Sequence, residues 1–172
     1  MNILTQFLLI GGVNEPVDST RIASVSVTIG LKDGVPHFSA SGFSLQQGRG
    51  MSSGIVLNTG DVDVSNMGTG DVTFTIRLDD EAWRAGYRFP SDAHQAVAIV
   101  YYPPNSPTAP DPVFGTGSWP AEFGEPGFSD GGKNLVFIDK DDNSDAYEYS
   151  VALNGPGGRV VLDPKIKNGG NN

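Results

Sequence analysis

Apolar and polar residues alternate along several short segments of this chain, and this pattern limits its fold more than any other feature. Residues 23–31 alternate around Val25 and Val27, with serine and threonine between the apolar positions. Residues 72–78 repeat the pattern around Phe74. A period of two sends successive side chains to opposite faces of a strand. Both segments are therefore predicted to be half-buried β-strands.

Turn residues separate the alternating segments at short intervals. Asp33-Gly34 follows the first strand and is typical of a two-residue hairpin turn. Residues 79–86 begin with aspartate and end with glycine, which predicts a short helix. Residues 95–102 are apolar on both faces, which predicts a central strand. Further strands are predicted at residues 35–41, 55–57, 134–139, 146–153 and 159–163.

The composition agrees with a chain built from strands. Valine, isoleucine and threonine together make up 34 of the 172 residues, and their branched side chains favour strands. Many short strands with almost no helix predict an all-β, single-domain antiparallel β-sandwich of immunoglobulin-like or jelly-roll topology. We expect this domain to span residues 1–166, followed by a frayed tail at residues 167–172.

The charge excludes two classes of partner. The chain has 20 acidic and 11 basic residues, a net charge of −9, and no segment gathers the basic residues into a stripe. Binding to nucleic acid needs clustered lysine and arginine, and an anionic membrane surface repels an acidic protein. We therefore expect neither nucleic acid nor membrane as a partner.

The first residues and the cysteine count bear on the compartment. The apolar run at residues 3–10 is interrupted by Thr5 and Gln6, and no basic residue precedes Arg21. A buried first strand therefore fits better than a secretory signal, and we expect a cytoplasmic rather than a secreted protein. The chain has no cysteine, which excludes disulfides and thiolate chemistry and leaves the compartment itself undecided.

An acidic segment at residues 139–145 is the best candidate for a cation site. Calcium takes 6–8 oxygen ligands, which such segments supply. The usual calcium loop fails here, because Ser144 and Ser150 stand where it needs glycine and glutamate. The alternative is a simple hairpin turn joining the strands on either side. The candidate ligands are Asp139, Asp141, Asn143 and Asp145.

Aromatic residues gather in and around a long proline-rich segment. Residues 103–120 contain six prolines and must form an extended loop. Aromatic side chains on such a loop can bind a sugar ring or a protein, or they can anchor the loop to the sandwich. The candidate ligand-binding residues are Tyr101, Tyr102, Phe114 and Trp119, with Phe123 and Phe128 nearby.

No catalytic motif stands out in the chain. It lacks Gly-x-Ser-x-Gly and a phosphate-binding glycine loop, and nothing in the sequence links its two histidines, His37 and His94. A glycoside hydrolase would need carboxylates brought to facing positions by the fold. We therefore expect no catalytic residues, although a hydrolase with acids from separate loops stays a minor alternative.

The last third of the chain resembles a known bacterial family. Residues 134–139 and 147–151 are followed by the sequence pattern Asp-Pro-x-Ile-x-Asn at residues 163–168. This pattern, with the dipeptides Asp163-Pro164 and Glu125-Pro126, resembles the bacterial DP-EP family. The resemblance implies a bacterial source, and it implies no activity because that family has none assigned. Pro164 is also predicted to end the last strand.

These observations favour a non-catalytic binding or self-assembly module without a required cofactor. The surplus of strand edges favours a homodimer, and the aromatic loop fits a protein or carbohydrate ligand. The alternative is a lectin-like domain that binds carbohydrate with the help of calcium held by the acidic segment.

Overall fold

The computed structural model describes residues 22–47, 55–56, 60–63, 70–103, 110–140 and 145–167. The first predicted strand and the end of the tail lie outside these residues. The elements are β1 (Ile22–Lys32), β2 (Val35–Gln47), β3 (Ile55–Val56), β4 (Val62–Asp63), β5 (Val72–Leu78), α1 (Asp80–Arg84), α2 (Ala93–Ala96), β6 (Val97–Tyr102), η1 (Thr116–Ser118), β7 (Gly127–Ser129), η2 (Asp130–Gly132), β8 (Asn134–Asp139), β9 (Ala146–Gly155), β10 (Gly158–Leu162) and β11 (Lys165–Lys167).

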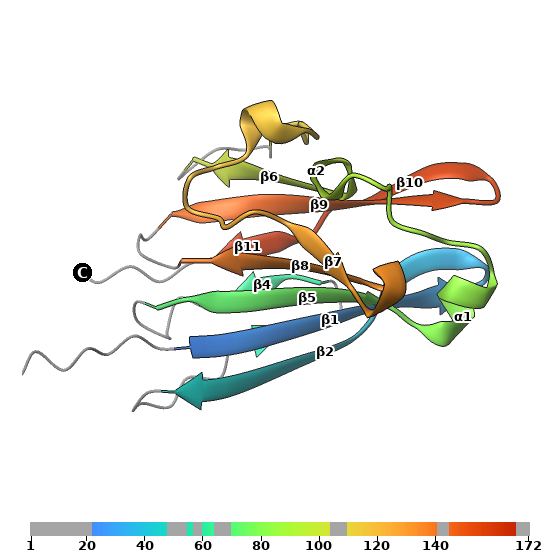
Figure 1. Ribbon diagram of the computed structural model, residues 1–172, viewed down its shortest axis with the longest axis horizontal. Helices are drawn as coiled ribbons and strands as arrows, with labels where there is room; N and C mark the ends of the chain where they lie inside the picture. Colours follow the sequence, from blue (N-terminus) through green and yellow to red (C-terminus); the bar gives the residue numbers. More distant parts are fainter. Residues whose placement is uncertain are drawn as a thin grey trace, which may run out of the picture.

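The strands form two packed sheets, so the expected all-β sandwich is confirmed (Figure 1). Sheet A has the order β2-β1-β5-β8-β7. Sheet B has the order β10-β9-β11-β4-β3, and β6 pairs with β9. In the part of the chain that is described, no helix is long and apolar enough to cross a membrane.

Two strand pairs are parallel, so the sheets are mixed rather than purely antiparallel. β1 pairs with β5 in parallel, and β4 pairs with β11 in parallel. Parallel neighbours need a crossover connection. Here the chain leaves sheet A after β2, contributes β3 and β4 to sheet B, and returns as β5 beside β1. The crossover therefore passes through the opposite sheet.

The hairpin β1–β2 forms as the sequence predicts. Asp33 and Gly34 have φ of 53° and 78°, and two positive φ values in succession are typical of the tight hairpin turn whose twist matches that of the strands. On β1, Val25, Val27 and Ile29 are buried. On β5 the buried and less buried positions alternate along all seven residues, as predicted.

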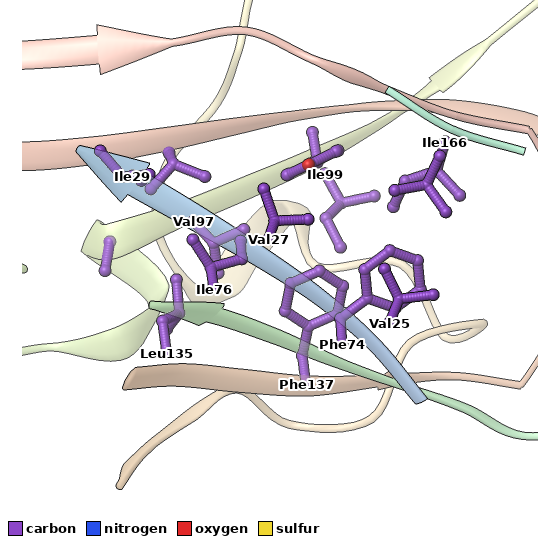
Figure 2. Packing of buried hydrophobic residues seen from close by; sticks show 14 of the residues in the cluster. Val25, Val27, Ile29, Phe74, Ile76, Val97, Ile99, Leu135, Phe137 and Ile166 are labelled. Atoms are coloured by element: carbon purple, nitrogen blue, oxygen red, sulfur yellow. The ribbon is translucent and has the colours of Figure 1, made fainter. Parts of the chain in front are cut away.

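The core lies between the two sheets. Figure 2 shows side chains of β1, β5 and β8 meeting those of β6 and β11. The rings of Phe74 and Phe137 stack with centroids 5.0 Å apart. Tyr149, from the opposite sheet, has its centroid 6.4 Å from that of Phe137. Phe74, Phe137 and Tyr149 are among the largest fully buried side chains, and their burial contributes apolar contact between the sheets.

The predicted central strand at residues 95–102 is wrong in two respects. Gln95 and Ala96 belong to α2, which starts because the Asp92 carboxylate accepts a hydrogen bond of 3.0 Å from the backbone N–H of His94. Within the described residues β6 pairs with β9 alone and stands at an edge of sheet B. The segment carrying η1 lies against β6 (Figure 1), which is why an edge strand is apolar on both faces.

The predicted hairpin across residues 139–145 is also wrong. β8 belongs to sheet A, where β5 and β7 occupy both of its edges, and β9 belongs to sheet B. The acidic segment therefore connects the two sheets. The end of the chain differs as well, because β11 follows Pro164 and pairs with both β4 and β9. Pro164 separates β10 from β11 rather than ending the last strand.

Candidate functional site

The short helix α1 positions the first wall of a cleft. Its N-cap is Asp79, whose carboxylate accepts a hydrogen bond of 2.7 Å from the backbone N–H of Ala82. Ala82 is fully buried, and Gly86, with φ of 93°, closes the turn after the helix. One face of α1 is thus fixed against the sandwich, and Trp83 lies half-buried beside the core.

Arg88 covers the ring of Trp83. Its guanidinium carbon lies 3.5 Å from the ring centroid, a close cation–π contact. Its Nη1 donates hydrogen bonds of 2.6 Å to the carbonyl oxygens of Trp83 and Tyr87. The backbone of Arg88 forms a bridge to Asn154 on β9. Backbone and side chain of Arg88 are therefore both held in place.

The second wall is a pair of phenylalanines. The rings of Phe89 and Phe128 stack with centroids 6.0 Å apart and an angle of 27°. Phe89 is buried and follows Arg88 directly, whereas Phe128 is 38% exposed and stands on β7. Pro90 continues the apolar surface. This pair joins the segment after α1 to β7 across the surface of the protein.

Two glycines form the third wall. Gly131 and Gly132 belong to η2 and have φ of 63° and 89°, and a Cβ added at either would meet no other atom within 4 Å. They present backbone to a cleft of about 280 Å³. The cleft is lined by Trp83, Arg88, Phe89, Pro90, Ser91, Phe128, Gly131 and Gly132, and we name it the Trp83 cleft.

One ion pair braces the cleft from outside. Lys133, which directly follows η2, has its Nζ 3.0 Å from Asp80 Oδ1 of α1, and this ties η2 to α1. The hydrogen bond and the charge of Lys133 lower the pKa of the exposed Asp80 carboxyl below its usual 3.8. The same ammonium lies 5.6 Å from the Trp83 ring centroid. The elements on the two sides of the cleft are thus linked directly.

The four predicted aromatic ligand residues lie in separate surroundings. Tyr101 is 43% exposed and packs edge-on against Tyr147 of β9. Tyr102 follows it on β6, and so it points to the opposite face of the strand. Phe114 lies against Arg159 of β10, with the guanidinium carbon 4.6 Å from the ring centroid. The ring of Tyr101 thus lies against β9 and the ring of Phe114 lies against β10.

Trp119 anchors the proline-rich segment to the core. Its Nε1 donates a hydrogen bond of 3.0 Å to the carbonyl oxygen of Phe123. Its ring packs edge-on against His94 at 5.3 Å, and against Phe137 at 6.2 Å. Of the aromatic residues around this segment, Phe128 lines the Trp83 cleft.

The predicted cation site is described in part. Asp139 is fully buried at the end of β8, and Asp145 precedes β9. Asp141 and Asn143 lie outside the described residues. Among the residues that the structure describes, no group of three or more histidine, cysteine, aspartate or glutamate side chains could hold a metal ion.

The two histidines lie on different elements. His37 lies on β2 of sheet A, and His94 lies on α2, which leads into β6 of sheet B. The Nε2 of His94 lies 3.0 Å from Glu125 Oε2, so Glu125 of the Glu125-Pro126 dipeptide holds the chain beside α2. His94 therefore links two surface segments.

Sequence reasoning predicted the helix that carries Trp83 and missed the cleft. Its two halves, residues 83–91 and 128–132, are far apart in the chain and meet through β7 and η2. One sequence signal could have indicated the cleft. Trp83, Arg88 and Phe89 place a cation and two aromatic rings on one short segment that begins in the capped helix.

Comparisons with known proteins give no further assignment. The resemblance to the DP-EP family stays a prediction that rests on the residues quoted for it. No family model matches the chain, and no curated protein matches it either.

Proposed function

We propose that this protein is a non-catalytic binding module and that the Trp83 cleft is its ligand site. The supporting observation is the lining itself, in which an arginine fixed on a tryptophan faces a stacked pair of phenylalanines. Tryptophan and arginine dominate the energetics of recognition surfaces, and small-molecule sites combine apolar walls with few polar groups.

Rigidity of the lining also supports a binding role. The Arg88 side chain donates to two carbonyl oxygens, Asp79 caps α1, and Lys133 ties η2 to α1. Groups held in place before binding lose little conformational entropy when a ligand arrives. The cleft is therefore organised for recognition without a large rearrangement.

A fragment screen read by tryptophan fluorescence and NMR tests this proposal. We would screen small aromatic and saturated ring compounds, both charged and neutral. The chain has two tryptophans, and Trp83 lies in the cleft. Bound fragments should perturb Trp83, and Phe128→Ala should weaken binding at least about tenfold.

Phe114→Ala is the matched control, because Phe114 is a half-buried phenylalanine outside the cleft. Loss of binding in Phe114→Ala with none in Phe128→Ala would place the ligand on the proline-rich segment instead. A screen without any hit that perturbs Trp83 would overturn the proposal.

The alternative is a calcium-assisted lectin-like domain, supported by the acidic residues between β8 and β9. Calcium at ~100 times its dissociation constant would stabilise the fold by ~2.7 kcal/mol. We would compare the melting temperature in EDTA and in excess calcium. A calcium-dependent rise that is lost in Asp141→Ala, together with calcium-dependent glycan binding, would favour the lectin. An unchanged melting temperature would exclude it.

Self-assembly is a further candidate, supported by β2. This strand is 13 residues long, and within the described residues its ladder partner is β1 alone. An open edge of this kind is a template for pairing with a second copy. Sedimentation velocity over a concentration series should then show a dimer, whereas a monomer at all concentrations would rule out this role.

A further inference from the structure

We propose that the Trp83 cleft takes a small organic carboxylate whose remainder is apolar, with Arg88 receiving the carboxylate. This inference rests on the proposed function and adds the chemical class of the ligand. It follows from the geometry of Arg88, from its charge and from the shape of the cleft.

The geometry leaves donors of Arg88 for a ligand. Both of the side-chain hydrogen bonds that Arg88 makes in the described part of the chain come from Nη1. A guanidinium has five N–H donors in a planar fork, so those on Nη2 and Nε are left over. Stacking on Trp83 fixes the plane of the fork. A fork held in this way matches the two oxygens of a carboxylate.

The charge of Arg88 favours an anion. Within the described residues no carboxylate lies within ion-pair distance of Arg88, although the protein carries a net charge of −9. The neighbouring Lys133 is paired with Asp80. A half-buried guanidinium beside apolar walls gains more from an incoming carboxylate than an exposed one does, because water screens it less.

The walls select the rest of the ligand. Arg88 occupies a face of the Trp83 ring, so a sugar cannot stack there. Phe128, Phe89 and Pro90 offer an apolar surface instead. The volume of about 280 Å³ lies near the lower end of small-molecule sites, ~300–1,000 Å³. A single ring or short chain with one carboxylate fits these conditions.

A matched pair of ligands tests the inference without any mutation. We would titrate phenylacetate and its neutral amide, phenylacetamide, and follow Trp83 fluorescence and the NMR signals of Arg88 and Phe128. We expect phenylacetate to bind at least about tenfold more tightly, since hydrogen bonds to charged groups are the stronger ones. Added salt should weaken the binding of phenylacetate and leave the binding of phenylacetamide unchanged.

Two variants separate the roles of the walls. Arg88→Gln should abolish the preference for the carboxylate. Phe128→Ala should lower the affinity for both ligands by the same factor. Arg88 also braces the carbonyls of Trp83 and Tyr87, so Arg88→Gln is informative only if it keeps the native NMR spectrum. Should it fail to fold, the comparison of the two ligands on the unmodified protein decides the matter.

The outcomes distinguish this inference from the proposed function. Equal affinities, both dependent on Phe128, would overturn the carboxylate assignment and keep the cleft as a binding site. Absence of binding by both ligands and by every fragment of the wider screen would overturn both. A dipeptide ending in phenylalanine, compared with its C-terminal amide, shows whether the carboxylate comes from a peptide. If the dipeptide binds more tightly than phenylacetate and its amide does not, the natural ligand is a peptide terminus.

Discussion

The hydroxyl of Tyr149 donates a hydrogen bond of 2.5 Å to the carbonyl oxygen of Gly60, across 89 positions of sequence. Tyr149 is fully buried on β9, and Gly60 precedes β4. The ring of Phe38, from β2 of the other sheet, lies against Gly60. One backbone position thus connects a buried polar group of sheet B to the core side chains of sheet A.

Tyr149→Phe should destabilise the fold by about 1–3 kcal/mol, because it leaves the buried carbonyl of Gly60 without its donor. Urea unfolding followed by circular dichroism measures the difference. Tyr101→Phe is the matched control, since Tyr101 is 43% exposed, and it should leave the midpoint nearly unchanged. Equal midpoints for the two variants would show that the Gly60 bond adds nothing to stability.

The advantage of Tyr149 over phenylalanine should shrink in alkali. Burial, and then the charge of Asp61, raise the pKa of Tyr149 above its usual 10.0 in the folded protein. The unfolded chain therefore ionises first, and stability is lost as the pH rises above 10. Urea unfolding of the wild type and Tyr149→Phe on both sides of pH 10 should show their difference falling. A constant difference would contradict the raised pKa.

Gly60→Ala should be among the most damaging single changes. Gly60 has φ of 85°, and a Cβ there would lie 2.6 Å from Cδ2 of Phe38. Left-handed backbone and overpacking together cost about 2–4 kcal/mol. Gly157→Ala is the control, because a Cβ at Gly157 meets nothing within 4 Å. Adding Phe38→Leu to Gly60→Ala should recover part of the lost stability. If it does not, the clash with the Phe38 ring is disproved.

The Asp80 carboxyl should titrate below 3.8, as the hydrogen bond and charge of Lys133 require. A lowered folded pKa adds stability above the unfolded value, and this part is lost as the pH falls through the folded pKa. An NMR titration should show the pKa of Asp80 returning toward 3.8 in Lys133→Met. Lys140→Met should have no such effect, because Lys140 Nζ donates to the carbonyl of Ala121 instead.

Local patterns predicted the elements well where one rule governed them. The alternation of β5, the turn at Asp33 and the aspartate cap of α1 all depend on residues close in sequence. The strand at residues 134–139 was predicted with its observed bounds. These features need no knowledge of the partner strands.

Partnership between distant segments could not be predicted in the same way. The acidic residues after β8 are typical of a hairpin turn, but the edges of β8 are occupied by β5 and β7. β6 is apolar on both faces because η1 lies against it, not because strands flank it. The Trp83 cleft needs β7 to bring Phe128 to Phe89. Each of these depends on tertiary contacts that periodicity does not encode.

The crossover through sheet B also sets the order in which the chain can fold. β1 and β2 can form a hairpin early. The other edge of β1 stays unpaired until β5 has been made, and the far edge of β5 stays unpaired until β8 has been made. Contacts between distant segments slow folding, because chain entropy is lost before they form. During synthesis the β1–β2 hairpin is therefore complete while its inner edge is still unpaired. Until β8 has left the ribosome, sheet A exposes a strand edge that other chains can join, so rapid synthesis at high concentration should favour aggregation over folding.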